Sequence, residues 1–167
     1  MHEPGVTAEE NSSCVRSSSG RNYFAKVGSA AEIEQFVGEA EALKAMHIAA
    51  PGLAPRLIDS GIVDAAGRGL DAGKPYFVSE YKNMGSLTET AAKKLAKRLA
   101  MEMHGYKSTQ GFGFAVPTFC GRTRQMNGWY TSWQECYDAL IRGLLSKLED
   151  KGGYEELCRK GKQVRER

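Results

Sequence analysis

The sequence predicts an α+β fold in which a small antiparallel sheet comes first and helices follow. Three observations lead to this prediction. A lysine, Lys26, lies inside the short aromatic and β-branched run Tyr23-Phe24-Ala25-Lys26-Val27, where a flexible cation is unusual. Glu39 follows on an amphipathic helix. Two more strand candidates come after this helix, and helical periodicity dominates the rest of the chain.

Length and composition describe an ordinary globular protein. The chain has 167 residues, of which 41% are hydrophobic and 26% charged, and its net charge is +3. This length fits one domain or slightly more. The chain lacks a dense basic tract interleaved with aromatics, so we expect no nucleic acid as partner. It also lacks an apolar run of about 18 residues and a secretory signal in residues 1–5, so we expect no membrane span.

The four cysteines are scattered along the chain. Cys14, Cys120, Cys136 and Cys158 form no C-x-x-C pair and have no histidine close by in the sequence. This spacing argues against a zinc site and against a disulfide scaffold. We therefore predict no metal site from the cysteines and expect a reducing, cytoplasmic location.

The first half of the predicted sheet precedes the glutamate helix. Residues 1–20 are polar and rich in Ser and Gly, and they leave room for one short strand, 14–16, before the strand 23–27. A capping box from Ser29 to Glu32 opens a helix that we expect to reach about Ile48. Glu39 flanks its apolar stripe, so it can reach a neighbouring strand while the helix stays packed. The stripe consists of Ile33, Phe36, Val37, Ala40, Leu43 and His47.

Two strands and a second helix follow. Residues 56–63 are predicted to be a strand bent at Gly61, and a glycine-rich loop, 64–73, leads to a buried strand, 75–81. After a break at 82–85, a second capping box, Ser86 to Glu89, predicts a helix to about Tyr106. We expect its cations to be solvated and its apolar stripe to be packed. The stripe consists of Ala91, Ala92, Leu95, Ala96, Leu99 and Met103.

The C-terminal part is predicted to be a loop followed by helices. Residues 105–128 show no clear period but carry many aromatics, which favours an ordered, functional loop. A third capping box, Ser132 to Glu135, opens a helix whose apolar stripe reads as core. A short helix, 154–159, and a basic tail end the chain. The stripe of the third helix consists of Trp133, Cys136, Tyr137, Leu140, Ile141, Leu144, Leu145 and Leu148.

This order of elements is that of a two-lobed kinase. A strand lysine paired with a helix glutamate is how kinase-type sites hold the α- and β-phosphates of a nucleotide. On their own, Lys26 and Glu39 also fit an edge-strand cation and a solvated helix residue. The strand break at residues 80–82 falls where a hinge between lobes would lie, and its backbone groups could bond an adenine edge. The sequence therefore predicts a polar segment 1–20, a sheet lobe with hinge 21–82, a partial helical lobe 83–160 and a basic tail 161–167.

Four stretches resemble the fructosamine-3-kinase (ketosamine-3-kinase) family, a branch of the aminoglycoside-phosphotransferase-like kinases. The most specific is the last, which combines a phenylalanine-glycine-phenylalanine run with paired tryptophans. The resemblance spans about 23–148. The stretches are Tyr23-Phe24-Ala25-Lys26-Val27, Gly38-Glu39-Ala40-Glu41-Ala42-Leu43, Phe77-Val78-Ser79-Glu80-Tyr81, and Gly111-Phe112-Gly113-Phe114 running on to Asn127-Gly128-Trp129-Tyr130-Thr131-Ser132-Trp133.

The resemblance implies an ATP-dependent kinase that phosphorylates the sugar moiety of ketosamines on glycated amines or proteins. It implies that Lys26 holds the nucleotide phosphates, that Glu39 orients Lys26, and that the backbone of Glu80, Tyr81 and Lys82 binds adenine. ATP and magnesium are the implied cofactors. Two alternatives stay open for Cys14: it lies on the hairpin that covers the phosphates, or it belongs to a disordered tail. The second stays open because serines replace the glycines that flank this cysteine in the family.

The chain departs from the family at the catalytic loop. Family members carry a histidine-glycine-aspartate loop and a metal-binding aspartate after the region corresponding to Leu148, and phosphoryl transfer needs those carboxylates. No such loop follows here, and His104 is followed by glycine and tyrosine. We therefore predict no catalytic or metal-binding residue, and a chain that is a truncated relative or a piece of a longer kinase.

Three functions remain open from the sequence. The first is a fructosamine-kinase-family protein, inactive as this chain. The second is a non-catalytic kinase-fold fragment that binds nucleotide or protein, and the third is an unrelated α+β domain. In either of the first two, an apolar surface on the helix starting at Trp133 would remain exposed, and we expect self-association through it.

Overall fold

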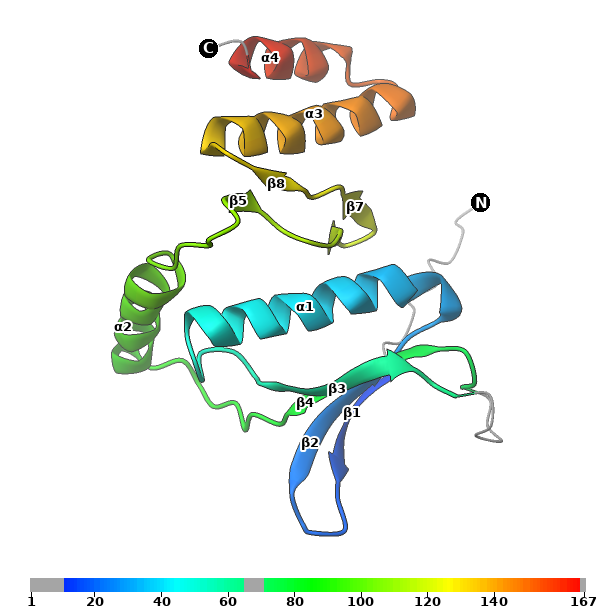
Figure 1. The fold of residues 1–167 in the computed structure, drawn as a ribbon, viewed down its shortest axis with the longest axis vertical. Helices are drawn as coiled ribbons and strands as arrows, with labels where there is room; N and C mark the ends of the chain where they lie inside the picture. The colour runs from blue at the N-terminus through cyan, green and yellow to red at the C-terminus, as the bar shows by residue number, and fades with distance from the viewer. Residues whose placement is uncertain (1–10, 65–70, 166–167) are drawn as a thin grey trace. The chain divides into compact units, whose positions relative to one another are not determined.

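The computed structural model describes residues 11–64 and 71–165 (Figure 1). The chain divides into two compact units, Met1–Gly105 and Tyr106–Arg167. Among the described residues, the first unit holds a four-stranded sheet and four helical segments, and the second holds two short two-stranded sheets and two helices. Most of the loop predicted at 64–73 lies outside the described residues.

The predicted antiparallel sheet is confirmed. Its strands are β1 (Asn11–Arg16), β2 (Asn22–Val27), β3 (Leu57–Ile62) and β4 (Pro75–Glu80), in the spatial order β1-β2-β4-β3. All neighbours pair antiparallel. The register shifts between Leu57 and Asp59, and Gly61 pairs with Tyr76 of β4. The bend expected at Gly61 stays a prediction.

The glutamate helix covers one face of this sheet (Figure 1). It begins with a 3₁₀ turn, η1 (Ala30–Glu32), and continues as α1 (Ile33–Ala49). The capping box is confirmed, because the backbone N–H and the hydroxyl of Ser29 each donate to Glu32 at 2.7 Å. Phe36 and Ala40 are buried against the sheet, whereas Ile33 and Val37 are exposed. The predicted stripe was therefore too wide.

The second helix differs from its prediction in its start, its end and its burial. Helix α2 (Glu89–Arg98) begins at the N-cap Thr88, whose hydroxyl accepts from the backbone N–H of Ala91, so the capping box predicted at Ser86 is wrong. A π-helical segment, η2 (Leu99–Met103), continues it. Neither segment buries a residue, and the leucines of the predicted stripe are exposed. The helix therefore forms where the period predicted one, but its stripe is not buried.

Short strands occupy the stretch that we predicted to be a loop. Strand β5 (Phe112–Gly113) pairs with β8 (Trp129–Tyr130), and β6 (Thr118–Cys120) pairs with β7 (Thr123–Gln125). Strands of two or three residues are too short to show a period of two, which explains why the sequence analysis missed them.

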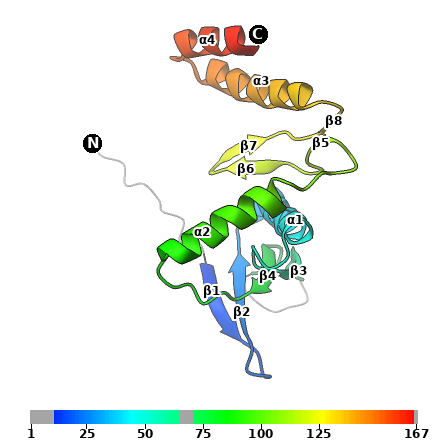
Figure 2. The same cartoon turned by 90° about the vertical axis from the view of Figure 1, so that its left-hand side faces the viewer.

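Two helices complete the second unit and lie side by side (Figures 1 and 2). They are α3 (Trp133–Lys151), whose capping box is confirmed, and α4 (Glu155–Arg165). The short helix predicted to end at Arg159 thus continues to Arg165, and Gly161 allows α4 to pack closely on Leu145 of α3. Only part of the α3 stripe is core: Cys136 and Leu145 are buried, and Trp133 and Tyr137 are exposed.

No helix within the described ranges is both long enough and apolar enough to cross a membrane. All four cysteines are free thiols. Cys14 lies on β1, opposite Phe24 of β2, so the alternative that placed it in a disordered tail is wrong.

Candidate functional site

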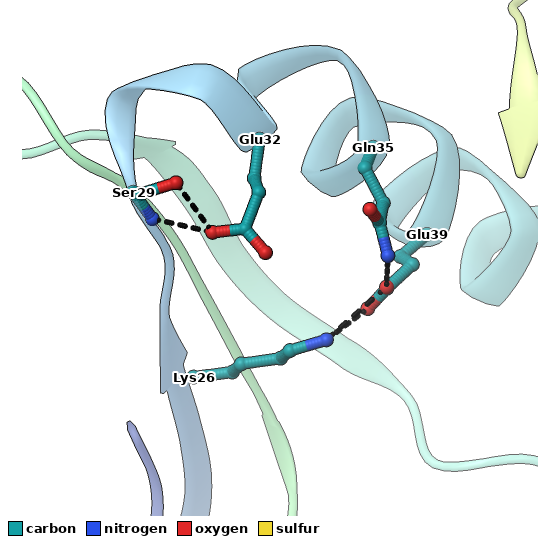
Figure 3. A network of polar contacts seen from close by, with 5 residues as sticks. All are labelled: Lys26, Ser29, Glu32, Gln35 and Glu39. Atoms are coloured by element: carbon teal, nitrogen blue, oxygen red, sulfur yellow. Dashed lines mark hydrogen bonds and ion pairs between the residues drawn. The ribbon is translucent and has the colours of Figure 1, made fainter. Parts of the chain in front are cut away.

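A lysine and a glutamate meet above the sheet (Figure 3). The Nζ atom of Lys26 on β2 lies 3.1 Å from both Oε1 and Oε2 of Glu39 on α1. The Nε2 atom of Gln35, one turn earlier on α1, donates to Oε1 of Glu39 at 3.3 Å. This geometry confirms the prediction that the two charged groups lie within pairing distance.

Aromatic side chains form the surroundings of the lysine. The Nζ atom of Lys26 lies 5.1 Å from the ring centroid of Phe36 and 6.0 Å from that of Phe77, both within cation–π range. The side chain of Lys26 is 12% exposed and that of Glu39 is 34% exposed. A partly buried ion pair of this kind fixes geometry more than it adds stability, since both charges lose hydration.

The fold explains why Lys26 points toward the helix. Side chains alternate along a strand, so Phe24 and Lys26 share one face of β2. Their partners in the register, Ser79 and Phe77, share the same face of β4. Phe36 of α1 packs on Phe77 with ring centroids 5.7 Å apart, and this contact places Glu39, one turn later, above Lys26.

An apolar pocket of about 540 Å³ lies beside the ion pair. Phe24 and Phe77 of the sheet, Leu43 of α1 and residues 80–84 contribute to its wall. Phe77 therefore borders the pocket and also contacts Lys26. An apolar cavity with a few convergent polar groups is the usual form of a small-molecule site.

Residues 80–82 border the pocket and are braced by ion pairs. The backbone N–H of Glu80 donates to the carbonyl of Arg56 at 2.9 Å, and its Oε2 accepts from the backbone N–H of Arg56 at 3.1 Å. The Nζ atom of Lys82 lies 2.8 Å from Oε2 of Glu80. The bond to Lys82, followed by that to the Arg56 backbone, lowers the pKa of the Glu80 carboxyl. The carboxylate thus ties the end of β4 to the residue that precedes β3.

The five residues singled out from the sequence form two neighbouring groups in the first unit. Lys26 and Glu39 are one group, and Glu80, Tyr81 and Lys82 are the other. The sequence analysis did not predict roles for Phe24, Phe77 and Ser79, which line the pocket between these groups. Their signal was the alternation along residues 23–27 and 75–81, which places them on the lysine face.

The described residues offer no metal centre. Among them, no group of three or more His, Cys, Asp or Glu side chains could hold a metal ion. The ion pair and the pocket fit the phosphates and the base of a nucleotide, because one offers a fixed cation and the other an apolar slot edged by backbone groups. Magnesium has no corresponding set of ligands in the described part of the chain.

A solved structure shares the fold of this chain. The structure of a Haemophilus somnus 129PT protein assigned as a fructosamine-3-kinase matches with a TM-score of 0.62 at 17% identity. The match covers 86% of this chain and 49% of that one. At this identity the likeness shows the fold alone.

The sequence places the chain in a family. The family profile described as fructosamine kinase matches residues 3–166, so this chain belongs to the fructosamine kinase family. The protein-ribulosamine 3-kinase, chloroplastic, of Arabidopsis thaliana is 32% identical over 142 residues. The protein of the same name from Oryza sativa subsp. indica is 32% identical over 126 residues.

The chain spans less than half the length of these curated relatives. Its alignment with the Arabidopsis protein covers 84% of this chain but 41% of the relative. With the rice protein the corresponding shares are 74% and 34%. The match to the family profile confirms, at the level of the family, the resemblance predicted from the four sequence stretches.

Proposed function

We propose that this chain is the nucleotide-binding part of a ketosamine kinase. In this proposal, Lys26 holds the α- and β-phosphates of ATP, and Glu39 fixes the position of Lys26. The observation that carries the proposal is the contact of the Lys26 Nζ atom with both carboxylate oxygens of Glu39, next to an apolar pocket that ends at Glu80–Lys82. A fixed cation beside an apolar slot suits a molecule with a phosphate chain and an aromatic base.

The adenine base would occupy the pocket with its polar edge toward residues 80–82. The N–H of Glu80 already donates to the carbonyl of Arg56. The donor for adenine must therefore come from Tyr81 or Lys82, while the Glu80 carbonyl serves as acceptor. This assignment supplies the one acceptor and one donor that an adenine edge requires.

The reaction that we propose for the complete kinase is phosphorylation of the sugar moiety of ketosamines on glycated amines or proteins. In the complete kinase, ATP would supply the phosphoryl group, and magnesium bound to ATP would neutralise charge on the phosphates. This chain's own contribution is binding and orientation of the nucleotide. A non-catalytic nucleotide-binding module is the alternative, and it uses the same residues. A cytoplasmic location stays a prediction.

Titration of the purified chain with ATP tests the proposal. Isothermal titration calorimetry should detect ATP binding by the original chain, and Lys26→Ala should weaken it about 10-fold or more, as expected for loss of a charged contact to phosphate. Glu39→Gln should weaken ATP binding less, since the lysine remains but is no longer held. Phosphate transfer by this chain to a fructosyl-lysine acceptor would exclude the non-catalytic module, whereas ATP binding without transfer fits both alternatives.

A matched control is available on the same helix. Lys44 is exposed and pairs with Glu41 at 2.6 Å on α1, so Lys44→Ala removes one positive charge and one ion pair away from the pocket. ATP affinity should be unchanged in this variant. Equal losses in Lys26→Ala and Lys44→Ala, or no ATP binding by the original chain, would contradict the proposed site.

A further inference from the structure

We infer that a second cavity, lined by Arg21, Arg56 and residues 80–82, binds a small phosphorylated sugar and that this binding weakens the affinity of the apolar pocket for ATP. The second cavity and its ligand stand apart from the proposed function, whereas the effect on ATP rests on it. The product of the proposed reaction is itself a phosphorylated sugar. The second cavity would therefore connect nucleotide binding to the level of that product.

The second cavity lies at the same end of β4 as the apolar pocket, on the other face of the sheet. Its volume is about 490 Å³, and residues 80–82 line it as they line the apolar pocket. Glu80 pairs with Tyr23 in the register, one position beyond the pair of Ser79 and Phe24 that lines the apolar pocket. Because side chains alternate along a strand, those of Tyr23 and Glu80 project away from α1. Residues 80–82 are therefore a wall shared by the two cavities.

Positive charge exceeds negative charge around the second cavity. Its described lining carries one carboxylate, that of Glu80, and three cations: Arg21, Arg56 and Lys82. The Nζ atom of Lys82 lies 2.8 Å from Oε2 of Glu80, and the Nε atom of Arg56 lies 3.7 Å from Oε1. Within the described residues, the guanidinium of Arg21 has no hydrogen bond or ion pair. This surplus of positive charge matches a phosphate monoester, which carries about two negative charges at pH 7.

The antiparallel sheet brings the two arginines together. Arg21 directly precedes β2 and Arg56 directly precedes β3. These strands flank β4, so both begin where β4 ends at Glu80. The backbone of Arg21 is fixed by the turn before β2: the N–H of Ser17 donates to its carbonyl at 2.9 Å, and its own N–H donates to the Ser17 hydroxyl at 3.2 Å. A guanidinium on a fixed backbone can bind two phosphate oxygens at once.

The rest of the lining suits the sugar part of the ligand. A volume of about 490 Å³ falls in the range of roughly 300–1,000 Å³ of small-molecule sites, and a phosphate group alone would fill little of it. Asn22 adds an amide that both donates and accepts, and Tyr23 adds a phenol hydroxyl. Neither side chain has a hydrogen bond within the described part of the chain. Sugar hydroxyls both donate and accept, so they can pair with both groups.

Two effects of the same sign connect the second cavity to ATP binding. A phosphate in it competes with the Glu80 carboxylate for Arg56 and Lys82, and so loosens the brace of residues 80–82, the proposed adenine edge. The phosphate also places negative charge near a pocket that we propose for a polyanion. Both effects weaken ATP binding. By linkage, ATP must weaken binding of the sugar phosphate by the same factor.

Calorimetric titration with fructose 6-phosphate tests the second cavity in the absence of nucleotide. The original chain should bind this probe, and should bind fructose, which lacks the phosphate, at least 10-fold more weakly. Arg21→Gln should weaken fructose 6-phosphate about 10-fold, as expected for the loss of charged hydrogen bonds to phosphate. Arg56→Gln is a second variant with the same expected loss if circular dichroism shows that Arg21→Gln does not fold.

Two controls accompany this titration. Arg16→Gln removes an equal charge from β1, in the same hairpin, but Arg16 does not line the second cavity, so affinity for fructose 6-phosphate should change little. Equal losses in Arg16→Gln and Arg21→Gln would contradict the site. Inorganic phosphate should bind more weakly than fructose 6-phosphate, because it cannot reach the sugar-binding groups. Equal binding of the two would overturn the assignment to a sugar.

A titration with ATP in saturating fructose 6-phosphate tests the coupling. The original chain should bind ATP about 5-fold more weakly than without the sugar phosphate, at the lower end of typical coupling between sites. Arg21→Gln should bind ATP alone as the original chain does and should lose most of this effect. An effect that persists in full in Arg21→Gln would place the sugar phosphate at Lys26 instead, and would contradict the inference.

The results separate this inference from the proposed function. If the chain binds ATP but not fructose 6-phosphate, or binds both without mutual effect, the inference is wrong and the proposed function stands. If the chain binds fructose 6-phosphate through Arg21 but does not bind ATP, the proposed function and the coupling are both wrong, and the assignment of the second cavity stands.

Discussion

The two units begin their longest helices in the same way but cover them differently. Helix α1 follows the capping box of Ser29 and Glu32, and α3 follows that of Ser132 and Glu135. On α1, Phe36 is 3% exposed beneath the helix, against the sheet. On α3, Trp133 is 58% exposed and Tyr137 is 42% exposed, although both belong to the apolar stripe.

This difference shows what a helical pattern can and cannot specify. A cap and a period of 3.6 are local properties, so the sequence of the helix contains them fully. Burial depends on whether another element supplies a complementary surface. The first unit supplies a sheet whose face toward α1 carries Phe77, and the packing of Phe36 on Phe77 brings Glu39 to Lys26.

The first prediction concerns catalysis and has the largest expected effect. The proposed nucleotide-binding residues lie in the first unit, and the described residues of both units lack a group of carboxylates able to hold a metal ion. We expect the purified chain to transfer no phosphate from labelled ATP to a fructosyl-lysine acceptor above the uncatalysed rate, even with magnesium present. Turnover that disappears in Lys26→Ala would show that the chain contains catalytic groups we have not identified.

The second prediction tests the unequal coverage of the two helices directly. Phe36→Ala should lower the free energy of unfolding of the first unit by about 3–5 kcal/mol, as is usual for a buried phenylalanine. Trp133→Ala removes a larger but exposed side chain, and should change the stability of the second unit by about 1 kcal/mol or less. Urea titrations followed by far-ultraviolet circular dichroism measure both changes.

Fluorescence assigns each transition to its unit. Both tryptophans, Trp129 and Trp133, belong to the unit Tyr106–Arg167. Phe36→Ala should therefore shift the circular dichroism transition while leaving the tryptophan transition nearly in place. A loss in Trp133→Ala as large as that in Phe36→Ala would mean that α3 is covered as fully as α1, and the difference between the units would disappear.

The sequence predicted more of the first unit than of the second, for a physical reason. Strand alternation and capping boxes identified the sheet and α1, and the separation of Lys26 from Glu39 matched a lysine strand followed by a glutamate helix. The pairing of β5 with β8 requires a glycine, since a side chain at Gly113 would collide with the carbonyl of Gly128. Such a contact cannot be predicted from a periodic pattern.

The third prediction concerns association through α3. Phe112, Trp133 and Tyr137 form an exposed series of aromatic rings, with adjacent centroids 6.3 and 5.9 Å apart. Exposed apolar patches of this kind promote association. We expect light scattering to show concentration-dependent self-association of the chain, and Trp133→Gln to weaken it about 10-fold or more, as large aromatics dominate interfaces. Gln134→Ala, on the same helix turn, is the control. A chain that stays monomeric at high concentration would contradict this prediction, because the exposed aromatic rings would then not bind a second copy of the chain.

The fourth prediction has the smallest effect and concerns the brace at the end of β4. Lys82 and the backbone N–H of Arg56 lower the pKa of Glu80 from its ordinary value of 4.5. A carboxyl whose pKa is lower in the folded state stabilises the protein above its unfolded-state pKa, and this contribution fades as the pH falls through the folded-state pKa. Glu80→Gln should therefore be less stable than the original chain at pH 7, and the difference should shrink as the pH drops below about 4.5, the ordinary carboxyl range. Because the side chain is partly exposed, solvent screening keeps this difference small.

Urea titrations of the original chain and of Glu80→Gln between pH 3 and 7 measure this stability difference. Glu89→Gln, which changes an exposed carboxylate on α2, is the control. A stability difference that stays constant over this range would show that the Glu80 carboxylate does not depend on its charge to hold β4 to Arg56.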